Sequence, residues 1–212
     1  MAKSSMAKNQ SVPPTHGTVS HGKLIVVIVA AALVVVLAFA SAFAWPGWAL
    51  NKTDDAVSTQ QTTSEPTKPT IQATKLPDAA SELLKAMPDS VLNYARTKAK
   101  GTEAWSSASP LEEYTVTYST GTKAKDVTLI VAQWSDADAA KKQYDALTGA
   151  LSGKDISSGN VKVSGKTTGS YVVKTDADNA KKAVAVWQND TVVFQVTGAK
   201  DAVRRFYPQF PL

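Results

Sequence analysis

The stretch VTLIVAQWSDADAAKKQYDALTGAL, residues 127–151, indicates the class of fold most directly. Its first eight residues form a nearly continuous apolar run, which is typical of a central β-strand that is buried on both faces. The apolar period then changes to that of a helix, and one stripe collects five side chains: Ala137, Ala140, Tyr144, Leu147 and Leu151. A buried strand that leads into an amphipathic helix predicts a domain that mixes α and β structure.

Further elements are expected on both sides of this stretch. Residues 78–87 are predicted to form a short helix, and residues 113–119 alternate as a half-buried strand does. Strand candidates at 161–164 and 169–174 precede the clearest hairpin, residues 183–197, with a two-residue turn at Asn189-Asp190. A short helix near 201–207 leads into an apolar tail. We therefore predict an α+β fold, an antiparallel sheet with helices mainly on one face, in the order α-β-β-α-β-β-β-α.

Two segments of this domain are similar to each other. AQWSDADAAKKQY at 132–144 and QVTGAKDAVRRFY at 195–207 each run from a strand end into a helix with paired basic residues. Duplication of one half is one interpretation, and chance recurrence of an alternating pattern is the other.

The N-terminal part contains a predicted membrane span, residues 24–44 (LIVVIVAAALVVVLAFASAFA), with 21 consecutive uncharged positions. As a helix this run is roughly 30 Å long, about the thickness of the bilayer's hydrocarbon core. Three lysines precede it, whereas only Lys52 follows within about twenty residues, so residues 1–23 are expected in the cytoplasm and the rest outside. Trp45 and Trp48 are expected at the membrane interface.

A cleaved signal peptide is the competing interpretation of the same run. Ala42-Phe43-Ala44 fits the small-x-small pattern, and cleavage after Ala44 would release a secreted protein. The apolar run is longer than the roughly 7–15 residues of a usual signal peptide core, which favours an uncleaved signal anchor. Both interpretations export the C-terminal part.

A polar segment separates the predicted span from the domain. After the turn WPGW, residues 51–75 contain nine Ser or Thr, three Gln and two Pro. Such a composition buries too little apolar surface to offset chain entropy, so residues 45–75 are predicted to be an interfacial turn followed by a disordered stalk. Residues 76–212 then form one extracytoplasmic α+β domain.

Composition argues against most enzyme chemistries. The chain has no cysteine, and its two histidines, His16 and His21, both precede the apolar run. The remainder therefore lacks the commonest general base and metal ligand, and we identify no catalytic, cofactor-binding or metal-ligating residue. Residues 76–212 carry 17 Lys and Arg against 15 Asp and Glu, so nothing favours nucleic acid as a partner.

Four aromatic residues are candidate partner contacts. Trp105 lies in the polar loop GTEAWSSASP, where a tryptophan would either fill the core or contact a partner. Phe206, Tyr207 and Phe210 lie in the C-terminal tail. An exposed apolar tail is unusual unless it docks against something.

In organisation, the chain resembles the small single-pass exported proteins of Gram-positive bacteria. We expect a membrane-anchored extracytoplasmic domain, non-catalytic, that binds another envelope protein, a wall polymer or a small ligand. The alternatives are an exported hydrolase or transferase that works without histidine, and a membrane-assembly subunit that acts through its anchor helix.

Overall fold

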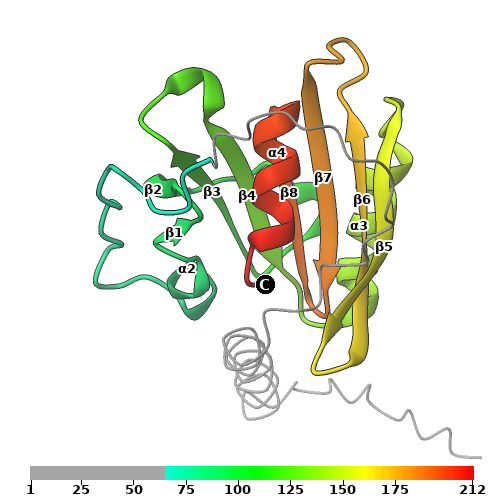
Figure 1. The fold of residues 1–212 in the computed structure, drawn as a ribbon. Helices are drawn as coiled ribbons and strands as arrows, with labels where there is room; N and C mark the ends of the chain where they lie inside the picture. The colour runs from blue at the N-terminus through cyan, green and yellow to red at the C-terminus, as the bar shows by residue number, and fades with distance from the viewer. Residues whose placement is uncertain (1–64) are drawn as a thin grey trace, which may run out of the picture.

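The computed structural model describes residues 65–212 (Figure 1). Its central layer is one eight-stranded sheet in the order β1-β2-β3-β4-β8-β7-β6-β5, and every neighbouring pair is antiparallel. The strands are β1 (Ser90–Val91), β2 (Tyr94–Gly101), β3 (Glu112–Ser119), β4 (Val127–Gln133), β5 (Asp155–Val163), β6 (Lys166–Thr175), β7 (Lys182–Asn189) and β8 (Val192–Ala199). The helical elements of this part are α2 (Glu82–Ala86), η1 (Ser106–Ala108), η2 (Lys123–Lys125), α3 (Ala137–Gly149), α4 (Lys200–Phe206) and η3 (Tyr207–Gln209).

The sheet consists of two meanders that meet at its centre. Strands β1 to β4 pair in sequence, strands β5 to β8 pair in sequence, and β4 then pairs with β8. The long helix α3 follows β4, and α4 follows β8. The α+β class and the antiparallel sheet predicted from the sequence are therefore confirmed.

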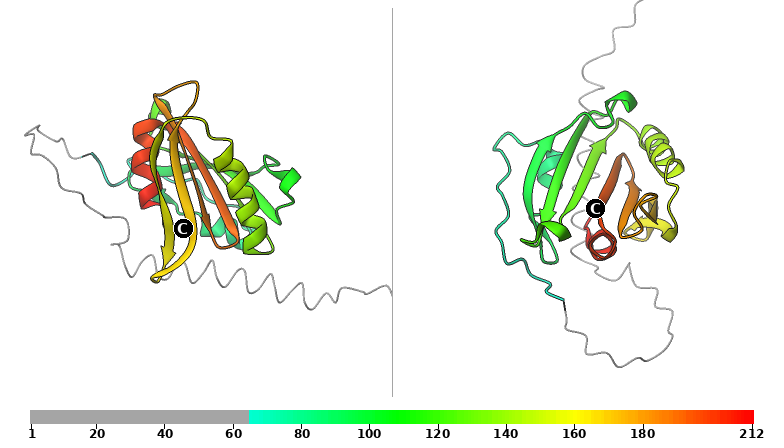
Figure 2. Two further views of the ribbon diagram at one scale, coloured as in Figure 1. Left: turned by 90° about the vertical axis from the view of Figure 1, so that its right-hand side faces the viewer. Right: turned by 90° about the horizontal axis from the view of Figure 1, so that it is seen from above.

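The helices cover both faces of the sheet, and the prediction that they lie mainly on one face is wrong. Helices α2 and α4 pack with Leu129 and Phe194 on one face, the α4 face. Helix α3, the longest, packs with Ala132 and Val193 on the opposite face, as Figure 2 shows. The central strands β4, β7 and β8 are buried on both sides, so each face needs its own cover.

The predicted order of elements is also wrong in its number of strands. Four strands precede α3 and four follow it. Strand β2 reads YARTKAKG, which has no clear apolar alternation, and its pairing with β3 holds it extended. The turn of the last hairpin comprises Asp190 and Thr191, one residue later than expected, because Asn189 pairs with Val192 and Asp190 has a φ of 52°.

The placement of α3 and α4 bears on the similarity between residues 132–144 and 195–207. A two-fold axis that exchanged the antiparallel neighbours β4 and β8 would run perpendicular to the sheet and keep both helices on one face. The two helices lie on opposite faces instead (Figure 2). No such rotation therefore relates the two halves.

Part of the segment predicted as a stalk contacts the domain. The backbone N–H of Thr74 donates to the carbonyl oxygen of Arg96 on β2 at 2.7 Å. Further toward the N-terminus, Glu65 forms an ion pair of 2.7 Å with Arg205 on α4. Residues 65–75 thus lie against the β2 and α4 side of the folded unit.

The predicted membrane span at 24–44 and the predicted interfacial residues Trp45 and Trp48 lie outside the described residues. Within residues 65–212, no helix has the length and apolar character needed to cross a bilayer.

Candidate ligand-binding groove

A groove of about 500 Å³ opens on the α4 face, between the hairpin of β5 and β6 and the segment that follows α4. Its volume is within the range of roughly 300–1,000 Å³ that small-ligand sites occupy. Eleven residues line it: Ser157, Ser158, Gly159, Asn160, Val161, Lys162, Tyr171, Trp187, Tyr207, Pro208 and Leu212.

One wall of the groove is the edge strand β5, and we call its residues 157–162 the polar wall. This wall reads SSGNVK, and only Val161 of these six is buried. Strand β5 pairs on one side with β6 and is the last strand of the sheet. Edge strands often carry such polar, solvated side chains because an apolar edge would invite aggregation.

Two tyrosines stand side by side over this wall. Tyr171 on β6 is directly opposite Gly159 on β5, and a Cβ atom at position 159 would come within 2.9 Å of the Tyr171 ring. The absence of that Cβ lets the ring lie across the strand. The ring centroid of Tyr207 is 5.9 Å away at an interplanar angle of 40°, and the Ser157 hydroxyl is 3.3 Å from that of Tyr171.

The environment of Tyr207 raises the pKa of its phenol, which is protonated at neutral pH in any case. Burial raises the pKa of Tyr207, while a hydrogen bond with Ser157 and the positive charge of Arg204 act in the opposite direction without reversing the shift. The neutral hydroxyl of Tyr207 can therefore both donate and accept a hydrogen bond at neutral pH.

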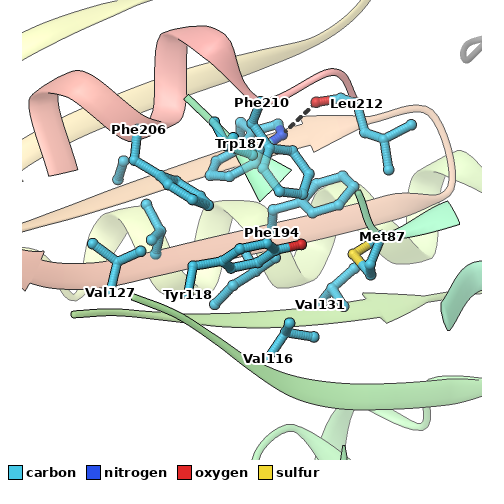
Figure 3. Close-up of a cluster of buried hydrophobic side chains, with 14 of the residues drawn as sticks. Met87, Val116, Tyr118, Val127, Val131, Trp187, Phe194, Phe206, Phe210 and Leu212 are labelled. Carbon is cyan, nitrogen blue, oxygen red and sulfur yellow. Dashed lines mark hydrogen bonds between the residues drawn. The ribbon is translucent and has the colours of Figure 1, made fainter. Parts of the chain in front are cut away.

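The other wall is apolar, and we define it as Trp187, Pro208 and Leu212. The indole Nε1 of Trp187 donates to the carbonyl oxygen of Leu212 at 2.9 Å (Figure 3). Trp187 also stacks on Phe194 at 4.8 Å, and the Phe210 ring packs edge-on against it at 5.5 Å. The apolar wall is thus the outer edge of the buried aromatic core.

The structure places three of the four candidate contact residues in the interior. Phe206 and Phe210 are 0% and 1% exposed beneath α4. Trp105 is 7% exposed, and its ring stacks on Trp134 at 6.3 Å on the α3 face. Their burial makes these three side chains core residues of this structure, whereas Tyr207 is partly exposed and lines the groove.

The sequence offered little to identify the remaining groove residues. Tyr171 and Trp187 lie in the segments 169–174 and 183–197, which were expected only as strands, and residues 157–160 precede the first of the strands expected there. Gly159 and Tyr171 are paired across neighbouring strands, and this pairing can be recognised only when the register of β5 on β6 is known.

The chemistry available in the groove is hydrogen bonding and aromatic contact. Lys162 is the one residue with a charged side chain among those that line it, and no Asp or Glu side chain is among them. Across residues 65–212, no group of three or more His, Cys, Asp or Glu residues is placed to hold a metal ion.

Comparisons with known proteins identify no relatives. No family model matches the chain, and no curated protein matches it. A solved structure of a GTP binding regulator from Thermotoga maritima aligns with a TM-score of 0.36 at 14% identity, over 56% of this chain and 79% of that one. A likeness this weak carries no argument about this protein.

Proposed function

We propose that the folded part of the chain is a non-catalytic binding module whose ligand occupies the groove, and that the segment at 24–44 anchors this module to the outer side of a membrane. The observation that carries the proposal is the meeting of three aromatic residues, Tyr171, Tyr207 and Trp187, with the Ser157 hydroxyl and the edge strand β5 in one concave site. Concave sites that combine aromatic rings with a few polar groups are where small ligands usually bind.

The walls of the groove are held in place before any ligand arrives. Trp187 is fixed by Phe194, Phe210 and the carbonyl oxygen of Leu212. Tyr171 is fixed by the strand beneath it and by its contact with Ser157. A preorganised site loses little side-chain freedom on binding, and this supports a role in recognition.

The absence of Asp and Glu side chains from the lining residues weighs against the alternative of a hydrolase without histidine. Acid–base chemistry without histidine would draw on paired Asp or Glu side chains. The carboxylates of Glu112 and Glu113 belong to β3, on the other side of the sheet centre from the groove.

The route of the chain supports presentation close to a membrane. Residue 65 lies at α4, on the same face as the groove, and twenty residues separate it from the end of the predicted span at Ala44. Twenty residues span at most roughly 70 Å even when fully extended. The module would therefore remain within that distance of the bilayer.

Photo-crosslinking in cells with the full-length chain tests the proposal. A photoreactive phenylalanine analogue replaces Tyr207 in the groove, and the same analogue at Leu111, an exposed side chain far from the groove, is the matched control. Mass spectrometry should find one adduct at position 207 that is absent at position 111. Identical adducts at both positions, or none at position 207, would contradict a role for the groove.

A further inference from the structure

We infer that the free edge of β5 pairs with the β5 strand of a second copy of this chain, so that two eight-stranded sheets join into one. The inference rests on the membrane anchoring in the proposed function, and it follows from a difference between the two edges of the sheet. Among the described strands, β5 is the last of the sheet and pairs only with β6. In the left-hand view of Figure 2 this edge faces the viewer, between α4 and α3.

The opposite edge of the sheet is protected against the addition of a strand. Strand β1 covers the start of β2. Next to it, the backbone N–H and the hydroxyl of Thr74 donate to the carbonyl oxygens of Arg96 and Thr97. The rest of β2 carries Lys98 and Lys100, both exposed. Lysines on an edge strand are a common means of preventing the addition of a further strand.

The centre of the β5 edge, in contrast, carries no charge. Residues 157–161 read SSGNV, and Ser158, Gly159 and Asn160 are exposed. Alternate residues of an edge strand direct their backbone N–H and C=O groups away from the sheet. These groups of β5 are available to a strand from another molecule.

The free edge of β5 is regular over the length that such pairing would use. Of the two register shifts between β5 and β6, one comes from an extra residue on β6, Thr168, and leaves β5 uninterrupted. The other comes from an extra residue on β5 itself, Ile156, so Asp155 and Ser157 lie one step apart in the pairing. Residues 157–163 therefore present an unbroken edge.

Charge favours one register for two antiparallel copies of β5. Pairing centred on Gly159 sets Ser158 opposite Asn160 of the second copy, and both side chains project from the α3 face. Because the bulge contains one extra residue, the same register sets Lys162 opposite Asp155 of the second copy, once on each side of the two-fold axis. The Asp155 side chain is 85% exposed in the single chain. Opposite charges that face each other across two strands are favourable.

The symmetry of this pairing is compatible with two anchors in one membrane. Identical antiparallel edge strands are related by a two-fold axis perpendicular to the sheet, which keeps the α4 faces of both copies on the same side. Residue 65 lies next to Arg205 on α4, so both chains leave the joined sheet from that side. Two anchors in one bilayer also raise the effective concentration of the copies, so a short interface is sufficient.

The pairing also leaves the groove accessible. The groove opens on the α4 face, whereas the new strand adds beside β5 in the plane of the sheet. Strand β5 forms a wall of the groove in each copy, so the two grooves lie on the same face, on either side of the joint.

Disulfide crosslinking of the full-length chain in liposomes tests this inference, because the sequence contains no cysteine that would interfere. Ser158→Cys and Asn160→Cys chains are reconstituted together and oxidised with copper phenanthroline. We expect the mixed pair to crosslink at least fivefold faster than either variant alone. Directly opposed Cβ atoms lie about 4.5–5.5 Å apart, whereas two copies of position 158 are diagonal neighbours at about 7–8 Å. Leu111→Cys, at an exposed position outside β5, is the control for random collision.

Charge variants in the mixed cysteine pair test the register. Lys162→Asp sets two carboxylates opposite each other and should slow crosslinking at least threefold. Asp155→Lys, which also loses the ion pair with Lys174, should be similarly slow, and the two changes in one chain should restore the rate. Lys166→Asp changes an exposed charge of the same hairpin that this register leaves unpaired, and should alter the rate less than twofold.

Three results would overturn the inference: a mixed pair that crosslinks no faster than Leu111→Cys, a mixed pair that crosslinks no faster than either variant alone, or a rate that Lys162→Asp leaves unchanged. The photo-crosslinking experiment separates this failure from that of the proposed function. An adduct specific to position 207, without crosslinking between positions 158 and 160, would keep the binding role and reject the pairing of two copies.

Discussion

The indole N–H of Trp187 donates a hydrogen bond to the carbonyl oxygen of Leu212 at 2.9 Å, and so joins β7 to a segment 25 residues further along the chain (Figure 3). Trp187 belongs to the buried aromatic cluster on the α4 face and also lines the groove. One side chain therefore links the stability of the domain to the shape of its candidate binding site.

Trp187→Phe should lower the free energy of unfolding by about 2–3 kcal/mol. The change leaves the buried carbonyl of Leu212 without its donor and opens a cavity beside Phe194 and Phe210. Chemical denaturation measures the change. The control is Leu111→Ala, which should change the free energy of unfolding by at most about 0.5 kcal/mol because Leu111 is 55% exposed. Equal effects of the two variants would contradict the role assigned to the indole.

Arg96→Ala should destabilise the domain by about 2–4 kcal/mol. The buried Arg96 guanidinium donates to the carbonyl oxygens of Met87, Pro88 and Thr74, and the substitution leaves these acceptors unpaired. The Arg96 guanidinium also forms an ion pair with Asp89. The Asp89 side chain is 79% exposed, so this ion pair contributes little to the free energy of unfolding.

Two further variants test whether Arg96 stabilises the domain mainly through its hydrogen bonds to the carbonyl oxygens or through its ion pair with Asp89. Asp89→Ala should cost less than about 1 kcal/mol, and Lys98→Ala, an exposed position two residues along β2, should be nearly neutral. A larger loss from Asp89→Ala than from Arg96→Ala would show that the ion pair is the main contribution.

Gly169→Ala should destabilise by about 2–3 kcal/mol because of its close approach to β7. A Cβ atom at position 169 would lie 1.9 Å from the backbone oxygen of Gln188, so the strands must separate to admit it. Gly101→Ala is the matched control, since its Cβ would meet no atom within 4 Å. Thermal denaturation of the two variants checks this, and similar melting temperatures would contradict the packing argument.

The stability of the domain should fall as the pH rises above 10. Burial raises the pKa of five of the six tyrosines, most strongly that of Tyr118, which donates to the carbonyl oxygen of Pro88. The folded state then binds protons more tightly than the unfolded state in this range, so the free energy of unfolding decreases with pH once the ordinary tyrosine pKa of 10.0 is passed.

Denaturant unfolding at pH 8, 10 and 11 measures this dependence. Tyr118→Phe should lower stability by about 1 kcal/mol at pH 8 and make the decrease above pH 10 shallower. An unchanged slope in Tyr118→Phe would mean that Tyr118 does not contribute to the pH dependence.

Local patterns predicted the strongest elements of this fold and missed the weakest. The apolar run that became β4 and the amphipathic stripe of α3 were correctly identified, because burial of those residues sets both patterns. Strand β2 was missed, since its extended conformation depends on pairing with β3 across the loop that contains Trp105. Trp105 could be expected from the sequence either to fill the core or to contact a partner, and its position against Trp134 depends on the same tertiary packing.

The candidate site was predictable only in one residue, Tyr207. Its neighbours in space come from β5, β6 and β7, and their roles depend on strand register.

The sequence by itself determined that this domain mixes helices with an antiparallel sheet, that its central strands are apolar, and that residues 22–212 contain no histidine or cysteine. These are properties of composition and of short-range period, which each segment carries alone. The tertiary structure alone decided that α3 and α4 cover opposite faces and that Tyr171, Tyr207 and Trp187 converge on one groove. Such features depend on pairing between residues far apart in the chain, and the free energy that selects one pairing belongs to the whole packed core rather than to any segment.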